Sequence, residues 1–281
     1  MTRAFEWPLD PSVYIGLAAL LAGHAWLAHR EGAPRRRQVY FGIGVLLIWA
    51  ALETPLDTLG DEYLQSAHMV QHMVLMACAP PFLLLGLTPA MARTVLGAVP
   101  RPLRYLIQPI PAQILYAATM IGWHVPPIYD LALENDTVHI VEHLSFLVVG
   151  VLFWWSLIEA TSSQADRPLN PVQKLLHLFV GTLPMMAVAL PLQFTPVLLY
   201  TPYASAPRVN AFLTPGVDQT VAGALMMFID MTAMTAAGLV VFFRWFTRAQ
   251  RADATRADAY ADLDPGDREV LQHVLDRMGR G

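Results

Sequence analysis

Five histidines of the chain combine a metal-binding residue type with a spacing that brings side chains together. Two pairs are four residues apart, His68 with His72 and His139 with His143, and His124 stands alone between the pairs. Residues four apart lie one turn apart on the same helix face, with roughly 5–6 Å between their Cβ atoms. Two imidazoles placed in this way can converge on one ion, and three or four ligands are enough for zinc or copper. The spacing indicates a helix face and leaves the metal open.

Methionines and one aspartate extend the candidate site. Met69 lies beside the first histidine pair, Met120 lies one turn before His124, and further methionines surround Asp230. Thioether sulfur favours Cu(I), so a mixed lining favours copper over zinc, although methionines at helical spacing also serve as core packing. Asp230 lies about eleven residues inside an apolar segment, so it must be protonated, paired or facing a wet cavity. A hydrogen-bonded structural aspartate is the alternative.

Long apolar blocks must position these residues. The chain has 281 residues, of which 55% are hydrophobic and 14% are charged, against roughly 45–50% and about 25% in soluble domains. Seven blocks approach the ~20 residues that cross ~30 Å of hydrocarbon. Their expected bounds are 13–29, 38–53, 68–88, 106–124, 137–158, 173–199 and 219–246. The predicted fold is therefore an all-α, polytopic membrane protein with seven transmembrane helices.

Basic residues predict the orientation of this bundle. Counted by alternate sides of the predicted spans, sixteen of the 18 Lys and Arg residues fall on one side, leaving Arg3 and Arg208 on the other. The positive-inside rule then places the N-terminus outside and the C-terminus in the cytoplasm. On this topology all five histidines lie at the outer side, where polar side chains at lipid depth are usually functional. The alternative is an interfacial hydrogen-bond network with Glu142 and the acidic loops.

Prolines within two spans predict irregular helices. Pro80-Pro81 lies in the third span, and Pro184 and Pro191 lie in the sixth. Proline removes a backbone donor and clashes with the preceding turn, so both helices should kink or break near these residues. Such breaks would leave room for a cavity inside the bundle.

A change in composition separates the end of the chain from the bundle. We expect a seven-helix domain over residues 1–247 and a charged cytoplasmic tail over residues 248–281. Apolar residues at helical spacing in the tail predict a short amphipathic helix. They are Leu271, Val274, Leu275 and Met278.

The remaining composition narrows the function classes. A net charge of −4 suggests no basic surface and argues against nucleic acid as a partner. Cys78 is the only cysteine, which excludes a disulfide framework and a thiolate metal cluster. The sequence contains no Gly-x-Ser-x-Gly elbow, phosphate loop or His-Glu-x-x-His motif, so familiar soluble-enzyme chemistries have no support.

The histidine blocks, taken as a set, resemble a known family. They are His68-Met69-Val70-Gln71-His72-Met73-Val74-Leu75 with Ala79-Pro80-Pro81 after it, Trp123-His124-Val125-Pro126-Pro127-Ile128-Tyr129-Asp130, and His139-Ile140-Val141-Glu142-His143 leading to Phe153-Trp154-Trp155. The set is similar to the polytopic CtaG family of cytochrome c oxidase assembly factors, the seven-span type of Gram-positive bacteria. The resemblance covers residues 40–247. It implies a role in making an active haem-copper oxidase, with copper delivery or insertion as the usual suggestion.

The resemblance therefore predicts an assembly factor of the bacterial inner (cytoplasmic) membrane and not an enzyme. Its expected partners are cytochrome c oxidase subunits and membrane lipid, and its expected cargo is copper, with zinc as the alternative. The positions that match the family's pattern are the five histidines, and we add Asp230, the acidic residue of the last span, as a further candidate. The predicted metal ligands are His68, His72, His124, His139, His143 and Asp230.

Two other functions stay open at this point. An intramembrane zinc-dependent hydrolase of the seven-span ceramidase type would activate water with three histidines, an aspartate and a serine. Asp230 is its candidate acid, but the last span has no histidine pair. A haem-binding or haem-transfer membrane protein would use histidines on facing helices as axial ligands, although two pairs at one level exceed what one haem needs.

Overall fold

The computed structural model describes residues 3–164 and 168–262, together with positions 264, 266, 267, 270 and 273. The chain divides into two compact units, Met1–Ala237 and Gly238–Gly281, and the first of these carries the five histidines of the predicted site. The described residues form helices and no β-strand, which confirms the predicted all-α class for this part of the chain. The predicted amphipathic helix of the tail falls on Leu271, Val274, Leu275 and Met278, which lie outside the described residues.

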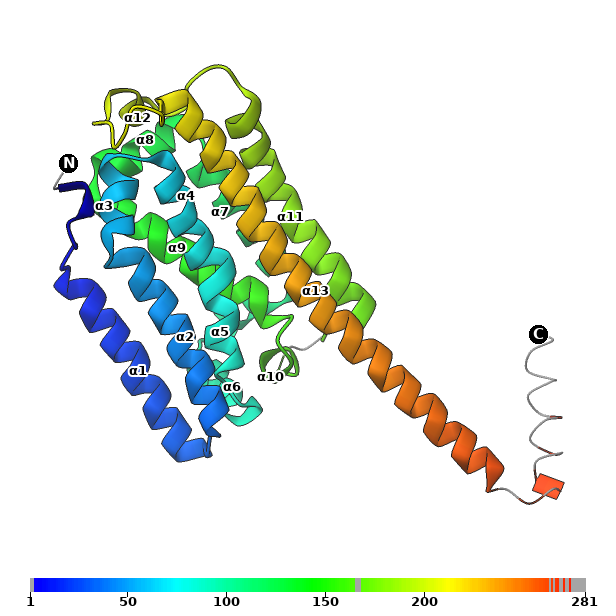
Figure 1. Cartoon of the computed structure of the whole chain (residues 1–281). Coiled ribbons are helices and arrows are strands. Elements are labelled where there is room, and N and C mark those ends of the chain that lie inside the picture. Colours follow the sequence, from blue (N-terminus) through cyan, green and yellow to red (C-terminus); the bar gives the residue numbers. More distant parts are fainter. Residues whose placement is uncertain are drawn as a thin grey trace. The chain divides into compact units, whose positions relative to one another are not determined.

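The long helices follow the expected apolar spans, and short helices connect them (Figure 1). The elements are η1 (Arg3–Phe5), α1 (Pro11–Glu31), α2 (Arg35–Leu52), α3 (Pro55–Glu62), α4 (Gln65–Met73), η2 (Val74–Cys78), α5 (Ala79–Leu85), α6 (Pro89–Ala98), η3 (Arg101–Ile107), α7 (Pro109–Trp123), α8 (Pro126–Glu134), α9 (Asp136–Trp155), α10 (Glu159–Ser162), α11 (Pro171–Phe194), α12 (Thr201–Ser205) and α13 (Pro215–Ala261). Each predicted span coincides with a long helix, or with α4, η2 and α5 in series. Helix α13 continues through the expected domain boundary at residue 247.

Five helical segments are long and apolar enough to cross a membrane. They are Pro11–Glu31, Gln65–Leu85, Asp136–Trp155, Pro171–Phe194 and Pro215–Arg256. A sixth crossing results if α2 and α3, which are bent by 43° at their junction, form one span. Helix α7 has 15 residues, or about 22 Å, which is shorter than a hydrocarbon core of ~30 Å. The chain is thus a membrane protein with five to six candidate spans, and the seventh stays a prediction.

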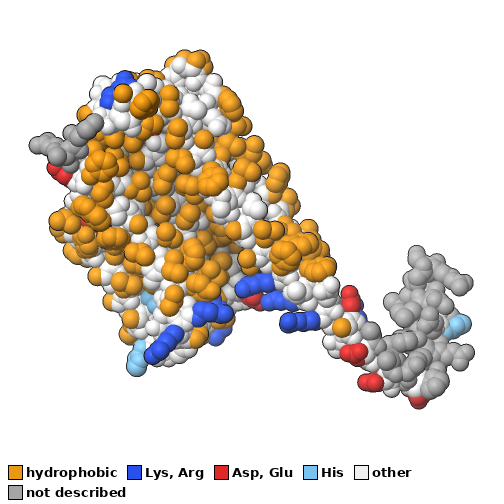
Figure 2. Space-filling view, viewed as in Figure 1, with side chains coloured by type: hydrophobic (Ala, Val, Ile, Leu, Met, Phe, Trp, Pro, Cys, Tyr) orange, Lys and Arg blue, Asp and Glu red, His pale blue; other side chains and the backbone are white. Residues whose placement is uncertain are grey.

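Large apolar side chains cover the outside of the bundle (Figure 2). On α7, Ile110 is 74% exposed and Ile114 is 61% exposed, and on α11 Phe179 is 63% exposed. Soluble monomers rarely expose contiguous apolar patches of more than a few hundred Å². Figure 2 also shows basic side chains gathered at the end of the bundle that carries α6. This distribution is typical of helices whose outer faces contact lipid.

The third predicted span changes its helix type just before Pro80-Pro81. Helix α4 ends at Met73, the segment Val74–Cys78 forms one π-helical turn, and α5 continues from Ala79. Because neither proline has an N–H to donate to the preceding turn, the wider π turn accommodates the interruption. Helix α11, in contrast, continues through Pro184 and Pro191 as one helix, so a break is wrong there and a kink stays a prediction.

Gly150 allows α9 to approach η2 and α5 closely. A Cβ at this position would lie 2.5 Å from the carbonyl oxygen of Met76 and 2.8 Å from Cγ of Pro80. Backbone and a proline ring cannot move aside as a flexible side chain does. We therefore expect Gly150→Ala to lower the free energy of unfolding by roughly 1–3 kcal/mol, measured by thermal denaturation in detergent.

Gly42→Ala on α2 is the control for this substitution. Within the part of the chain that the structure describes, no atom lies within 4 Å of the position of its Cβ apart from Gly42 itself, its two chain neighbours and the adjacent backbone of α2. The control substitution should be neutral or mildly stabilising, since alanine favours helix more than glycine does. An equal loss of stability in both variants would contradict the close approach at Gly150.

Candidate metal centre

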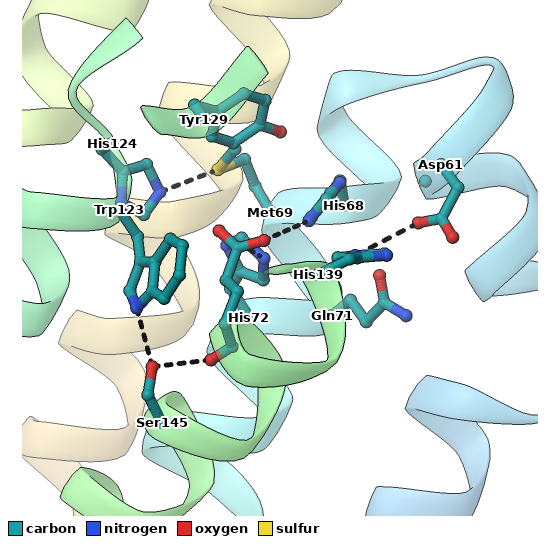
Figure 3. Close-up of polar contacts among 12 residues, drawn as sticks. Asp61, His68, Met69, Gln71, His72, Trp123, His124, Tyr129, His139 and Ser145 are labelled. Carbon is teal, nitrogen blue, oxygen red and sulfur yellow. Dashed lines mark hydrogen bonds and ion pairs between the residues drawn. The ribbon is translucent and has the colours of Figure 1, made fainter. Parts of the chain in front are cut away.

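Three helices bring the predicted histidines together into what we call the histidine cluster. His68 and His72 lie on α4, His139 and His143 lie on α9, and His124 ends α7. The ring centroids of His68 and His139 are 5.1 Å apart, and those of His72 and His143 are 5.5 Å apart. The ring of His124 is 5.7 Å from that of His72. Figure 3 shows His68, His72 and His124 around one interior region, whereas Nε2 of His139 faces the Asp61 carboxylate at 3.6 Å.

Asp218 on α13 holds the start of α4. Its carboxylate oxygens accept hydrogen bonds from the backbone N–H groups of Gln65, at 2.7 Å, and Ser66, at 3.3 Å. The first N–H groups of a helix have no partner within the helix and carry partial positive charge, so a carboxylate is favourable there. Because His68 lies in the first turn of α4, Asp218 also sets the position of the His68 side chain.

Tyr203 on α12 determines the tautomer of His68. Its hydroxyl donates a hydrogen bond to the carbonyl oxygen of Gly60 at 2.6 Å and lies 3.0 Å from Nδ1 of His68. Burial raises the pKa of the Tyr203 phenol well above its ordinary value, so the hydroxyl keeps its proton. That proton is directed at Gly60, which leaves the Tyr203 oxygen as an acceptor for an N–H at Nδ1 of His68. Nε2 of His68 then has a free lone pair, the form that binds a metal.

Glu142 on α9 faces this lone pair, although it was not among the predicted ligands. Its Oε2 is 3.8 Å from Nε2 of His68, and its Oε1 is 3.6 Å from Nε2 of His72. Among the described residues, none of these four atoms has a hydrogen-bond partner. A buried carboxylate that faces a lone pair is costly unless a proton or a cation lies between them. Its position between His139 and His143 in the sequence was the signal that could have found it.

Four side chains, which we call the His/Glu group, are arranged as metal ligands would be. They are His68, His139, Glu142 and His143. One ligand atom from each lies within 4.8 Å of all the others. Ligand atoms bound at 2.0–2.1 Å in a tetrahedral zinc site are ~3.3 Å apart, so modest side-chain movements would close the group around an ion. The donor set of three imidazoles and one carboxylate suits zinc or copper.

Hydrogen bonds hold the helices around the cluster in place. The Trp123 indole donates to Oγ of Ser145 at 2.7 Å, and this hydroxyl donates to the carbonyl oxygen of Glu142 at 2.8 Å (Figure 3). Tyr200, in the segment before α12, donates to the carbonyl oxygen of His124 at 3.0 Å. These bonds join α7 to α9 and to the connection between α11 and α13. The cluster is therefore positioned by side chains outside the predicted site.

Asp230 lies apart from the His/Glu group. It is fully buried on α13, where its electrostatic neighbours are Tyr116 on α7 and Cys78 in η2. Tyr116 precedes His124 by eight residues, which corresponds to about 12 Å along a helix. Its neighbourhood is therefore different from that of the histidines, and a metal-binding role for Asp230 stays a prediction.

Comparison with known proteins identifies a family whose sequence pattern the chain matches. The sequence pattern of the cytochrome c oxidase caa3 assembly factor family (Caa3_CtaG) matches residues 18–248. Uncharacterized protein Mb0105 of Mycobacterium bovis and uncharacterized protein MT0111 of Mycobacterium tuberculosis are each 26% identical to the chain, over 98% of its length and 45% of theirs. The chain thus spans less than half the length of these relatives. No solved structure gives a significant match.

Proposed function

This chain belongs to the cytochrome c oxidase caa3 assembly factor family, as its histidine blocks predicted, and on that premise we propose that it binds copper and delivers it to a haem-copper oxidase. One observation carries the proposal. The free lone pair of His68 Nε2 faces the buried Glu142 carboxylate at 3.8 Å, with the imidazoles of His139 and His143 beside them. A cation among these four side chains would turn an unfavourable contact into a set of ligand bonds.

The chemistry of delivery follows from where the ligands lie. A donor that holds copper between helices can pass it to an acceptor in the same membrane by ligand exchange, without exposing the ion to water. Release requires that the site does not bind the ion too tightly. The ligands of the His/Glu group come from two helices, α4 and α9, so a small movement of either helix can open the site. The protein then acts by binding and transfer and has no turnover of its own.

The proposal includes the membrane topology predicted from the sequence. Seven spans, an N-terminus outside and a cytoplasmic C-terminus would place the histidine cluster at the outer side of the bacterial cytoplasmic membrane. Copper would enter from that side, and the oxidase subunits would receive it there. The gathering of basic side chains at the α6 end of the bundle supports this orientation.

The proposal is tested by replacing His68, His72 and His143 together with alanine. We expect the purified variant to lose bound copper, measured by elemental analysis after loading with Cu(I), and cells that carry only this variant to lack haem-copper oxidase activity. His29→Ala is the control, because His29 lies exposed at the end of α1. Unchanged copper binding in the triple variant would overturn the site. Lost copper binding with normal oxidase activity would overturn delivery.

Tyr203→Phe should weaken metal binding without removing a ligand. Without the phenol oxygen, Nδ1 of His68 loses the acceptor at 3.0 Å, and the tautomer with a free Nε2 is less strongly favoured. Outer partners of this kind typically contribute 10–100-fold to metal affinity, so we expect a loss of about that size in a chelator competition assay. Tyr105→Phe, at an exposed residue of η3, should leave the affinity unchanged. Equal affinities in the two variants would contradict the role of Tyr203.

A further inference from the structure

Met69 adds a sulfur atom to the histidine cluster on the side away from the His/Glu group. Its Sδ lies 3.3 Å from Nε2 of His124, and the Met69 side chain is fully buried (Figure 3). The other ring nitrogen of His124, Nδ1, is 2.7 Å from the carbonyl oxygen of Met120. A carbonyl oxygen only accepts hydrogen bonds, so Nδ1 carries the hydrogen. In the neutral imidazole, Nε2 then has the lone pair.

This tautomer leaves two electron-pair donors facing each other. A thioether sulfur has no hydrogen to donate, and neither does Nε2 of neutral His124. A charged imidazolium at this place would be a buried cation against a thioether and a carbonyl, which is costly. A soft cation between the two atoms would resolve the conflict, because Cu(I) favours thioether and imidazole ligands.

The distance between the two atoms fits such an ion. With the bond lengths of zinc sites, about 2.3 Å to sulfur and 2.0–2.1 Å to nitrogen, the two donor atoms are about 3.5 Å apart at a tetrahedral angle and about 3.8 Å apart at a trigonal one. The observed separation between Sδ of Met69 and Nε2 of His124 is 3.3 Å. Little rearrangement is therefore needed to place an ion between them.

His72 provides a third donor and connects the two sides of the cluster. Neither of its ring nitrogens has a hydrogen-bond partner within the described ranges of the chain. Its ring is 5.7 Å from that of His124 on one side, and its Nε2 is 3.6 Å from Glu142 on the other. His72 can therefore serve either set of ligands in turn.

We propose that the histidine cluster holds two metal positions, of which the second is a Cu(I) position formed by Met69, His124 and His72. We call these three residues the Met/His set. The proposal rests on the proposed function for the identity of the cargo, and it adds the oxidation state and a second set of ligands. Because His72 lies between His124 of the Met/His set and Glu142 of the His/Glu group, an ion can pass from one to the other by exchanging one ligand at a time.

The test uses the full chain in detergent, loaded with Cu(I) under reducing conditions, and X-ray absorption at the copper edge. We expect the wild type to bind two equivalents and to show a copper–sulfur distance near 2.3 Å. Met69→Leu should lose the sulfur signal and weaken one copper site by at least about tenfold, with Zn(II) binding unchanged. Met185→Leu, at an equally buried methionine of α11, is the matched control.

The possible outcomes separate this proposal from the proposed function. Absence of a sulfur ligand in the wild type, or its persistence in Met69→Leu, overturns the Met/His set even if the triple histidine variant loses copper. A sulfur ligand that depends on Met69 supports the Met/His set, and normal oxidase assembly in a triple variant that binds no copper then overturns delivery alone. His124→Gln serves as a second variant if Met69→Leu does not fold, and it should also remove the sulfur signal.

Discussion

Replacing Glu142 with glutamine is expected to stabilise the metal-free protein and to weaken its binding of a divalent metal. The Glu142 side chain is fully buried, and neither of its carboxylate oxygens has a hydrogen-bond partner among the described residues. If ionised, it is an unpaired buried charge; if protonated, it has taken up a proton at neutral pH at a cost in free energy. The glutamine amide avoids both costs and can donate to Nε2 of His68. We expect the free energy of unfolding to rise by about 1–3 kcal/mol.

The same substitution removes the anionic member of the His/Glu group. We expect Zn(II) affinity to fall by at least about tenfold, because a neutral amide oxygen is a poor substitute for a carboxylate. Thermal denaturation with and without chelator measures both effects, which have opposite signs. Glu134→Gln, at an exposed residue of α8, is the control and should change neither quantity. Destabilisation of the metal-free Glu142→Gln protein would show that the carboxylate already has a stabilising partner. It would contradict the proposal that Glu142 is a metal ligand.

Asp218→Ala is expected to destabilise the fold and to weaken the metal centre together. The substitution leaves the N–H groups of Gln65 and Ser66 without acceptors at a buried helix start, for which we expect a loss of about 2–3 kcal/mol in the free energy of unfolding. The first turn of α4 should loosen as a result. Because His68 lies in that turn, metal affinity should fall as well, although Asp218 itself is not a proposed ligand.

Asp10→Ala separates these two effects. Asp10 is an exposed cap of α1 that accepts a hydrogen bond from the N–H of Ser12 at 2.8 Å, so its loss should lower stability by about 1 kcal/mol. Its metal affinity should equal that of the wild type. Thermal denaturation and Zn(II) titration of both variants test this, and a normal affinity in Asp218→Ala would contradict the role of Asp218 in positioning His68.

Residues that lie close together in the sequence accounted for most of what could be predicted. The four-residue spacing of His68 with His72, and of His139 with His143, placed each pair on one helix face, and the structure has them on α4 and α9. Helical periodicity and the ~20-residue apolar blocks likewise indicated the long helices. Pro80-Pro81 indicated an irregular turn because the missing donors are a local property of proline. The same reasoning was wrong for a break in α11, where the helix continues through both prolines.

Contacts between distant segments could not be predicted in this way. Tyr203 is 135 residues from His68, and Asp218 is 153 residues from Gln65. Neither pair has a spacing that a helix or strand would indicate. Glu142 was visible in the sequence as a neighbour of two histidines, but only the packing of α4 against α9 turns its carboxylate toward His68 and His72. Asp230 had a suggestive place within an apolar span, and packing gives it Tyr116 and Cys78 as neighbours.

The sequence by itself determined the class of the protein, its family resemblance and the two histidine pairs, because hydropathy and helical periodicity act over one or two turns. Tertiary structure decided which donors meet and in what form. The free lone pair of His68 depends on Tyr203 and Gly60, and that of His124 on the carbonyl of Met120 and the close approach of Met69. Whether a buried donor faces a proton, another donor or a partner depends on the packing of separate helices, and the ligand chemistry of this protein follows from that packing.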